Sequence, residues 1–476
     1  MKKVSFSLYF LCIGVLFSII LLTAGGCANI IPPGGGPRDT IPPKLASAVP
    51  KDSVTSFKGN RIVLTFNEYV TLDNINEQLV MSPFPKNQPI VESKLRNVTV
   101  KLRDSLEANT TYTINFGNAI KDVNEGNVAR QMRYVFSTGS KIDGDSITGH
   151  VQLAETGKID STLLVLLHSN LSDTAIYKVR PRYIAKLDGK GNFRFLNMPQ
   201  GKFNIYVLPN DYAKKYDDST KIFAFGDSII TAGSHQNRVL LYAYQEFKEV
   251  KEQRKSSSTT KKNDKEKPKE KPLKLLTAVN GVQDLLEDFE IAVDRKIRSF
   301  DTAKIVLTDT NYKPVSNIHF SWADTSFTRI ALKHPWVENS HFKLIIQKDA
   351  LTDSAGIGLP KTDTLSFVTK RESEYGSLLL RFPQIDLSQN PVLMLLQGDK
   401  QIVSEPITKV EWYRKLFPPG DYEVRILFDH NKNGIWDKGN FKEKIQPEIV
   451  LTGKPDKVTV RSNFDREFDV SVEKVH

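Results

Sequence analysis

One loop near the carboxyl end of the chain carries oxygen-bearing groups at alternate positions, an arrangement that suits a hard cation. The ligands that it offers are Asp429, Asn431, Asn433, the carbonyl oxygen of Ile435, and Asp437. Gly434 allows a sharp bend, and Ca²⁺ takes about six to eight oxygens around such a bend. The twelfth position is Asn440, where a bidentate glutamate is usual, and the loop follows a predicted strand. Two interpretations stay open, a Ca²⁺ site or an Asn-Gly turn in a long hairpin.

Residue patterns typical of catalysis do not accompany this loop. The eight histidines are scattered, and the sequence contains neither a His-Glu-x-x-His pair nor a Gly-x-Ser-x-Gly elbow. Gly226, Asp227 and Ser228 lie between Phe225 and two isoleucines, which favours a turn over a hydrolase nucleophile. His168 ends an apolar run and is interpreted as structural. We therefore expect no catalytic residues, and an enzyme is the least favoured class of protein.

The other residue with distinctive chemistry is Cys27. It follows two lysines at the start of the chain, an almost entirely apolar stretch at residues 4–22, and the small residues 24–26. This is the three-part layout of a secretory signal. Small residues directly before a cysteine resemble the lipobox of bacterial lipoproteins, which implies removal of residues 1–26 and acylation of Cys27. The alternative is an uncleaved anchor, because residues 4–24 approach the length of about 20 that crosses a bilayer.

Either form tethers the remaining chain outside the cytoplasm, and we expect a lipid anchor in the outer membrane that faces the periplasm or the cell surface. Each buried CH₂ contributes about 0.8 kcal/mol, so two or three acyl chains hold stably. Cys12 lies inside the apolar stretch, so no thiol of the mature chain remains for a disulfide. Residues 27–44 are rich in proline and glycine, which predicts a stalk.

The positive charge of the chain is concentrated in one low-complexity segment. Residues 248–274 contribute +6 of the net charge of +11, so the folded parts are close to neutral. We expect no nucleic-acid partner on this ground. Residues 246–275 are predicted to be a charged, disordered linker. A solvated spacer is the favoured role, and contact with anionic head groups or envelope polymers is the alternative.

Residues 45–139 alternate apolar and polar side chains with a period of two. Ile62, Leu64 and Phe66 form one such set, which predicts half-buried antiparallel strands and a β-sandwich. Five stretches in and just before this region resemble the bacterial Ig-like domain first known from S-layer proteins: residues 39–44, 62–70, 109–114, 119–127 and 134–138. The resemblance implies an Ig-like sandwich that serves as a spacer or adhesive module, with no catalysis.

Residues 140–245 continue with short strands and glycine turns. Residues 163–167 are wholly apolar, and residues 187–195 and 198–208 have the pattern of a hairpin. Gly189, after Asp188, and Gly201 are predicted to supply turns with positive φ. The pattern resembles the carboxypeptidase regulatory-like domain, a transthyretin-like sandwich. That resemblance implies an accessory or spacer domain without catalytic residues.

The second half of the chain repeats this arrangement. Residues 339–346, 350–356 and 365–369 parallel 109–116, 119–126 and 134–138, so residues 276–370 resemble a second, divergent Ig-like domain. Residues 392–396 and 418–427 parallel 163–167 and 199–208, so residues 371–476 resemble a second transthyretin-like domain. A two-by-two array is the simplest interpretation.

These observations predict an all-β protein of tandem Ig-like and transthyretin-like sandwiches behind a lipoprotein signal. The favoured function is a non-catalytic scaffold that contacts an envelope protein or polysaccharide. The alternative is a ligand-binding surface protein, for a glycan for example, ordered by Ca²⁺ at residues 429–437. A platform for stacking sugars would use Trp322, Trp336, Trp412 and Tyr413, although such aromatics are usually core residues. The partner and the oligomeric state are left open.

Overall fold

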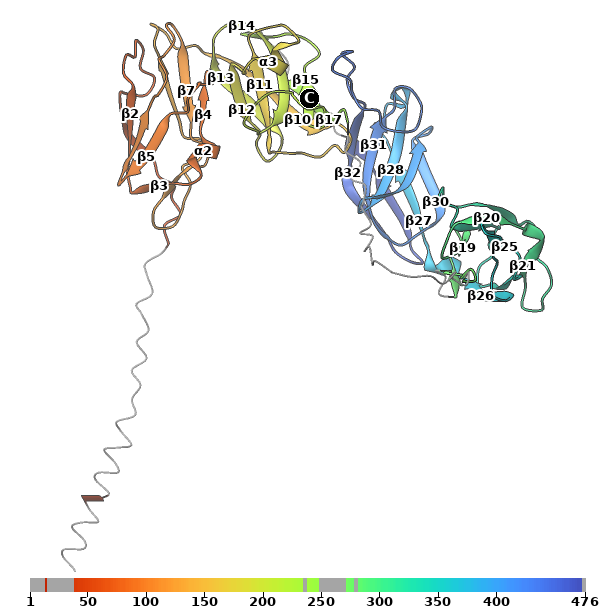
Figure 1. Cartoon of the computed structure of the whole chain (residues 1–476). Helices are drawn as coiled ribbons and strands as arrows, with labels where there is room; N and C mark the ends of the chain where they lie inside the picture. Colours follow the sequence, from red (N-terminus) through yellow and green to blue (C-terminus); the bar gives the residue numbers. More distant parts are fainter. Residues whose placement is uncertain (1–12, 15–37, 234–237, 248–270, 278–280, 473–476) are drawn as a thin grey trace, which may run out of the picture. The chain divides into compact units, whose positions relative to one another are not determined.

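The computed structural model describes residues 13–14, 38–233, 238–247, 271–277 and 281–472 (Figure 1). Strands dominate these residues, and the predicted all-β class is confirmed. Among them, no helix is both long enough and apolar enough to cross a membrane. The chain divides into two compact units, residues 1–142 and residues 143–476. Buried apolar side chains form four large clusters in the described ranges, one in each of four successive sandwiches.

The first unit contains one sandwich. One sheet has the order β1 (Leu45–Val49), β2 (Arg61–Phe66), β6 (Asn97–Lys101) and β5 (Ile90–Lys94), and the other has the order β4 (Val80–Ser82), β7 (Thr111–Asn115) and β9 (Arg133–Ser137). A small ribbon pairs β3 (Val70–Leu72) with β8 (Ile120–Asp122), and α2 (Ile75–Gln78) is a single turn. The alternation at Ile62, Leu64 and Phe66 turns all three side chains into the core.

The second sandwich opens the second unit. Its strands follow the order β12 (Tyr183–Lys186), β11 (Leu163–His168), β14 (Gly201–Pro209), β15 (Ile222–Phe225), β17 (Val239–Gln245), β10 (Asp145–Leu153) and β13 (Asn192–Met198), and β16 (Ile230–Ala232) also pairs with β14. The helix α3 (Ala175–Lys178) follows β11. All six residues of β11 are buried, so both faces of this strand are covered.

The predicted glycine conformations in this sandwich are wrong. Gly191 has a φ of 78°, whereas neither Gly189 nor Gly201 lies in the left-handed region. The turn is fixed instead by the Asp188 carboxylate, whose Oδ1 accepts hydrogen bonds from the N–H groups of Lys190 and Asn192, both at 2.8 Å. The bend therefore falls two residues later than the Asp-Gly pair suggests.

The third sandwich uses β18 (Val282–Gln283), β19 (Phe289–Ala292), β20 (Ile297–Phe300), η1 (Thr302–Lys304), β21 (Ile305–Thr308), β22 (His319–Trp322), β23 (Arg329–Lys333), β24 (His341–Ile346), β25 (Leu351–Asp353) and β26 (Asp363–Thr369). Leu273 is buried in its core, and the Leu273 N–H donates to the Gly358 carbonyl oxygen at 3.0 Å. Residues 271–275, which the sequence places in the linker, thus already contact this sandwich.

Strand pairing in the third sandwich matches that in the first. The orders β19-β23-β22, β21-β24-β26 and β20-β25 correspond to β2-β6-β5, β4-β7-β9 and β3-β8. Even the weak contacts correspond: the parallel bridge of Val54 with Phe136 has its counterpart in the parallel pairing of β18 with β26. The two sandwiches therefore share one topology, along the segments that the internal repeat aligns.

The fourth sandwich uses β27 (Gly376–Arg381), β28 (Pro391–Gln397), β29 (Lys400–Pro406), β30 (Glu411–Phe417), β31 (Gly420–Phe428), β32 (Ile449–Val460), β33 (Asp465–Asp469) and β34 (Ser471–Val472), with short turns η2 (Glu372–Glu374) and η3 (Leu387–Gln389). Its first strand β27 pairs antiparallel with β30 and parallel with β33, just as β10 pairs with β13 and β17 in the second sandwich. Likewise β28 lies between β29 and β31, as β11 lies between β12 and β14.

A segment of the fourth sandwich, residues 438–447, is docked on the second. The buried ring of Phe441 lies 5.0 Å from Phe223 and 5.1 Å from Phe225, measured between ring centroids. The Phe441 N–H donates to Glu246 Oε1 at 2.8 Å, and Lys444 Nζ lies 2.7 Å from Asp173 Oδ1. Further contacts to Phe441 come from three tyrosines, Tyr177, Tyr206 and Tyr216. We call this set of contacts the aromatic joint.

Replacing Phe441 by alanine should weaken the aromatic joint by about 3 kcal/mol, the usual loss when a buried phenylalanine is truncated. The amides of β15 and of residues 438–447 should then exchange hydrogen faster in the mature protein. The matched control is Phe464→Ala in the same sandwich, because Phe464 is largely exposed. Equal exchange protection in the two variants would show that the joint contributes nothing.

Candidate functional site

The structure describes only one of the two sites predicted from the sequence. Cys27 and residues 1–12 and 15–26 of the predicted signal lie outside the described residues, so acylation of Cys27 stays a prediction. The oxygen-rich loop at residues 429–437 is described in full, directly after β31. Its geometry can therefore be compared with what a cation needs.

The Asp429 side chain is buried and closes the loop. Its Oδ1 accepts a hydrogen bond from the Lys432 N–H at 2.7 Å, and its Oδ2 accepts one from the Gly434 N–H at 2.7 Å. Gly434 has a φ of 76°, the left-handed conformation that glycine adopts without strain. The bend expected at Gly434 is therefore present, and backbone N–H groups hold the Asp429 carboxylate at the base of the loop.

Three of the predicted ligands converge on one point. The side-chain amides of Asn431 and Asn433 donate to Asp437 Oδ2 at 2.5 and 2.7 Å. The oxygens of the same two amides accept from the backbone, since the Asn433 N–H donates to Asn431 Oδ1 at 3.0 Å. Ile435 has an exposed side chain, and its N–H donates to Asn433 Oδ1 at 2.7 Å.

Glu448 is a member of this loop that the sequence analysis missed. Its buried carboxylate accepts a hydrogen bond from the His430 N–H at 2.7 Å and another from the Asp437 N–H at 3.0 Å. The Trp436 indole N–H donates to the Glu448 carbonyl oxygen at 2.7 Å. Glu448 lies one residue before β32, so it enters the loop from the returning strand. The ligand spacing within residues 429–440 therefore gives no signal for Glu448.

Carboxylates and imidazoles alone do not make a metal centre here. In the ranges that the structure describes, no group of three or more His, Cys, Asp or Glu side chains is placed to hold a metal ion. A cation at residues 429–437 would therefore need the amide oxygens of Asn431 and Asn433 beside Asp437. Hard oxygen ligands of this kind suit Ca²⁺ and not a softer metal.

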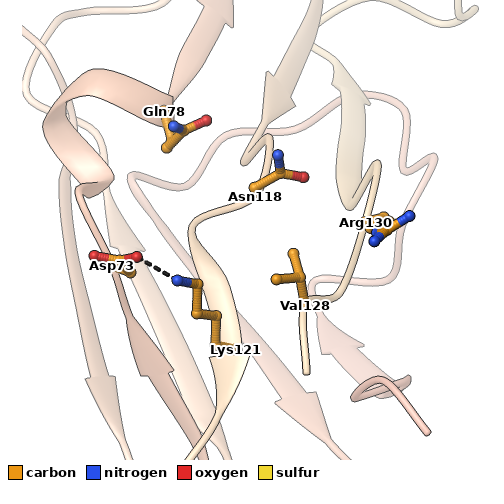
Figure 2. Close-up of a pocket in the computed structure, with 6 residues that line it drawn as sticks. All are labelled: Asp73, Gln78, Asn118, Lys121, Val128 and Arg130. Carbon is orange, nitrogen blue, oxygen red and sulfur yellow. Dashed lines mark hydrogen bonds and ion pairs between the residues drawn. The ribbon is translucent and has the colours of Figure 1, made fainter. Parts of the chain in front are cut away.

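The first sandwich has a pocket of about 470 Å³ that the sequence analysis did not single out. Its lining consists of Asp73, Gln78, Asn118, Lys121, Val128 and Arg130. Figure 2 shows the ion pair of Asp73 with Lys121 on one side of the pocket and Arg130 on the other. The lining side chains offer amides and charges of both signs, which suit a polar ligand, and include no thiol, hydroxyl or imidazole.

Beside this pocket, the buried Asp122 organises the loop that closes the ribbon of β3 and β8. Its carboxylate accepts hydrogen bonds from the N–H groups of Glu125, Gly126 and Asn127 at 2.6, 2.9 and 2.8 Å. Burial raises the pKa of Asp122, but these donors outweigh burial and hold the pKa below the usual aspartate range. Asp353 takes the same place in the third sandwich, where it accepts from the N–H groups of Ala355 and Ile357.

The remaining candidates are structural. His168 is buried in β11, neither ring nitrogen has a hydrogen-bond partner among the described residues, and burial lowers its pKa to about 4. Residues 226–229 form the bend between β15 and β16. Trp412 belongs to the fourth core, whereas Trp322 and Trp336 pack against the third. Three of the four aromatics thus serve the cores of two sandwiches, and only Tyr413 is exposed.

Comparison with known proteins identifies one domain. Residues 39–138 match the bacterial Ig-like domain family. The similar solved structures include the Bacillus anthracis TIE protein, with 10% identity over 93% of this chain and 76% of that chain, at a TM-score of 0.15. They also include the N-terminal part of the bacterial S-layer protein SbsC (17% identity, 43% of this chain and 44% of that chain, TM-score 0.16). A third is BcpA, the major pilin subunit of Bacillus cereus (12% identity, 69% and 99%, TM-score 0.17). All three TM-scores lie below 0.2, and no curated protein matches the chain.

The low pKa of Asp122 makes the first sandwich sensitive to acid. A carboxylate whose pKa is lower in the folded state stabilises that state above its unfolded pKa, and the stabilisation is lost as the pH falls toward the folded pKa. We therefore expect the hydrogen-exchange protection of β7 and β9 to fall below about pH 4. The variant Asp122→Asn should lose about 1–3 kcal/mol at neutral pH, and most of this pH dependence with it.

The matched control for Asp122→Asn is Glu92→Gln, which removes an exposed carboxylate that pairs with Lys101 in the same sandwich. A surface pair of this kind contributes about 0–1 kcal/mol, so this variant should keep the parent's acid response. If Glu92→Gln and Asp122→Asn shift the response equally, Asp122 is not its source.

Proposed function

We propose that this chain is a lipid-anchored protein of the bacterial cell envelope that acts, without catalysis, as a structural or interaction scaffold. The observation that carries the proposal is the match of residues 39–138 to the bacterial Ig-like domain family, together with the recurrence of the same strand pairing in the third sandwich. Repeated sandwiches of this kind extend a chain and present its loops, while each keeps its own core. The second and fourth sandwiches would be transthyretin-like spacers of the carboxypeptidase regulatory type.

The mechanism is positional. Cys27 would carry the acyl chains at the membrane surface, and the sandwiches that follow would hold their loops away from it. The partner would be another envelope protein or a polysaccharide, met by surface loops and exposed strand edges. In this proposal the outer membrane is the site of anchoring, on its periplasmic or its outer face.

Replacing Cys27 by serine tests the anchor. The parent protein should remain with the membranes after a carbonate wash and should begin at an acylated Cys27 by mass spectrometry. The Cys27→Ser variant should appear largely in the soluble fraction, because the acyl chains that hold it are absent. The control is Cys12→Ser, which removes the other cysteine of the chain and should change nothing. Native material that begins at an unmodified Met1 would contradict the proposal.

A second candidate function is Ca²⁺-assisted ligand binding at residues 429–437. The observation in its favour is the approach of the Asn431 and Asn433 side chains to Asp437 Oδ2, in a loop whose carboxylates lack a lysine or arginine partner within the part of the chain that the structure describes. In the described residues, no lysine or arginine is paired with Asp429 or Asp437, and Glu448 Oε1 lies 4.0 Å from His430 Nδ1. Buried carboxylates are usually paired with a cation or bound to a metal, and Ca²⁺ would supply the missing charge.

A melting experiment on the mature protein with Ca²⁺ or with EDTA tests this candidate. An ion that binds only the folded state stabilises it by RT ln(1 + [L]/Kd), about 2.7 kcal/mol at one hundred times Kd. Asp437→Ala should abolish the Ca²⁺-dependent shift, whereas Asp421→Asn, on β31 of the same sandwich, should keep it. Identical melting curves in Ca²⁺ and EDTA would exclude the metal.

A further inference from the structure

Three large apolar side chains are exposed together at one end of the first sandwich. The exposed fractions of Tyr69, Leu95 and Val123 are 53%, 65% and 57%. Tyr69 and Val123 are cross-strand neighbours, since Tyr69 precedes Val70, Val123 follows Asp122, and Val70 pairs with Asp122. The Val123 N–H donates to the Tyr69 carbonyl oxygen at 3.2 Å. The Val70 N–H donates to the Leu95 carbonyl oxygen at 2.9 Å, which brings the third residue alongside. We call Tyr69, Leu95 and Val123 the apolar tip.

A leucine at position 95 does not favour folding of the sandwich. It is the first of the two residues that connect β5 to β6, and its φ of 56° is a conformation in which glycine or asparagine is usual. An apolar side chain there is both conformationally unfavourable and exposed to water. The core of the sandwich gains nothing from it, because Leu95 is not among the buried or packed residues of that core.

The apolar tip lies at the end of the first sandwich where the chain enters from its N-terminal side. The Arg38 guanidinium donates to the Glu125 carbonyl oxygen at 3.3 Å, and the Asn127 side-chain amide donates to the Asp39 carbonyl oxygen at 2.9 Å. Residues 38–39 therefore run beside the loop that begins at Val123. Figure 1 shows the ribbon that begins at residue 38 close to β3.

The chain leaves the first sandwich at the opposite end. The strand β9 runs from Arg133, opposite Asn115, to Ser137, opposite Thr111. The Thr138 N–H then donates to the Thr110 carbonyl oxygen at 3.1 Å. Leu102, which follows β6 on the side away from Leu95, also lies at this exit end, where its N–H donates to the Asn60 carbonyl oxygen. The chain thus enters and leaves the first sandwich at opposite ends, which are separated by the length of the strands.

Arg38 lies only eleven positions after Cys27. That length of chain spans at most about 40 Å when fully extended, so an acylated Cys27 keeps Arg38, at the same end of the sandwich as the apolar tip, within that distance of the bilayer. A tether of this kind raises the effective concentration of the tip at the surface, so that a weak contact suffices. Charges of both signs surround the tip, with Arg96 lying over the Tyr69 ring at 5.5 Å and Glu68 adjacent in the chain. Such surroundings suit zwitterionic head groups.

We propose that the apolar tip rests in the head-group region of the same bilayer that holds the acyl chains. The inference rests on the proposed lipid anchoring of Cys27 and adds a second membrane contact to it. A tyrosine with an apolar ring and a polar hydroxyl is well suited to the interface, and Leu95 and Val123 reach the apolar boundary beneath it. Two points of attachment fix the direction in which the first sandwich stands.

A fluorophore at the apolar tip tests this contact in the acylated protein. The mature chain has no other free thiol, so Val123→Cys can be labelled alone with an environment-sensitive dye. The control is Lys58→Cys, an exposed position near Phe57, whose N–H donates to Ser137 at the exit end. Both proteins are reconstituted into phosphatidylethanolamine and phosphatidylglycerol vesicles that contain spin-labelled lipid. Quenching should be at least about twofold stronger at position 123 than at position 58.

A second variant separates the contact from the fold. Leu95→Gly removes the apolar side chain and relieves the backbone at that position, so the protein should melt as before or slightly higher. Introduced beside the label at position 123, it should reduce the quenching by about half. Equal quenching at positions 58 and 123, with Cys27 acylated, would overturn the proposal.

The mass of the same protein preparation shows whether Cys27 is acylated, which separates failure of the lipid anchor from failure of the membrane contact at the apolar tip. If Cys27 carries no acyl chains, the anchoring itself fails, and the membrane contact at the apolar tip fails with it. If Cys27 is acylated and only the quenching pattern is absent, the anchor stands and the apolar tip does not touch the bilayer.

Discussion

Burial of the apolar face of each sheet by packing alone is the constraint on which this structure depends. The chain has two cysteines, both within its first 27 residues, so no disulfide can support the sandwiches. Each sandwich accordingly builds its own apolar cluster from alternating strand residues. Where one sheet has a second apolar face, as at the fully buried β11, other parts of the second unit must cover it. The aromatic joint at Phe441 meets that requirement for part of the sheet that contains β14 and β15.

Much of the architecture could be predicted because it depends on local patterns. Alternation at Ile62, Leu64 and Phe66 reports directly which face of a strand is buried, and the internal repeat identified segments that form corresponding strands, such as β7 with β24 and β11 with β28. Trp412 could be assigned to a core because large aromatics are rarely left exposed without a partner. The all-β class needed no more than this periodicity.

The features that could not be predicted arise between segments that are distant in the sequence. Glu448 joins the loop at residues 429–437 from the following strand, and Phe441 is buried by a different sandwich, so neither has a local signal. The polar pocket combines α2 with the residues around β8 for the same reason. Gly189 was assigned a positive φ that Gly191 takes, because the hydrogen bonds of Asp188 decide where the turn bends.

The aromatic joint also determines how the second unit would carry mechanical force. Tension applied between the two ends of this unit passes from β15 through Phe441 into β31 and β32, which flank the docked segment. The third sandwich lies on the chain between those attachment points and is bypassed. It bears load only after Phe441 and the contact of Lys444 with Asp173 have given way. The aromatic joint thus protects the core of the third sandwich from tension until the joint itself opens.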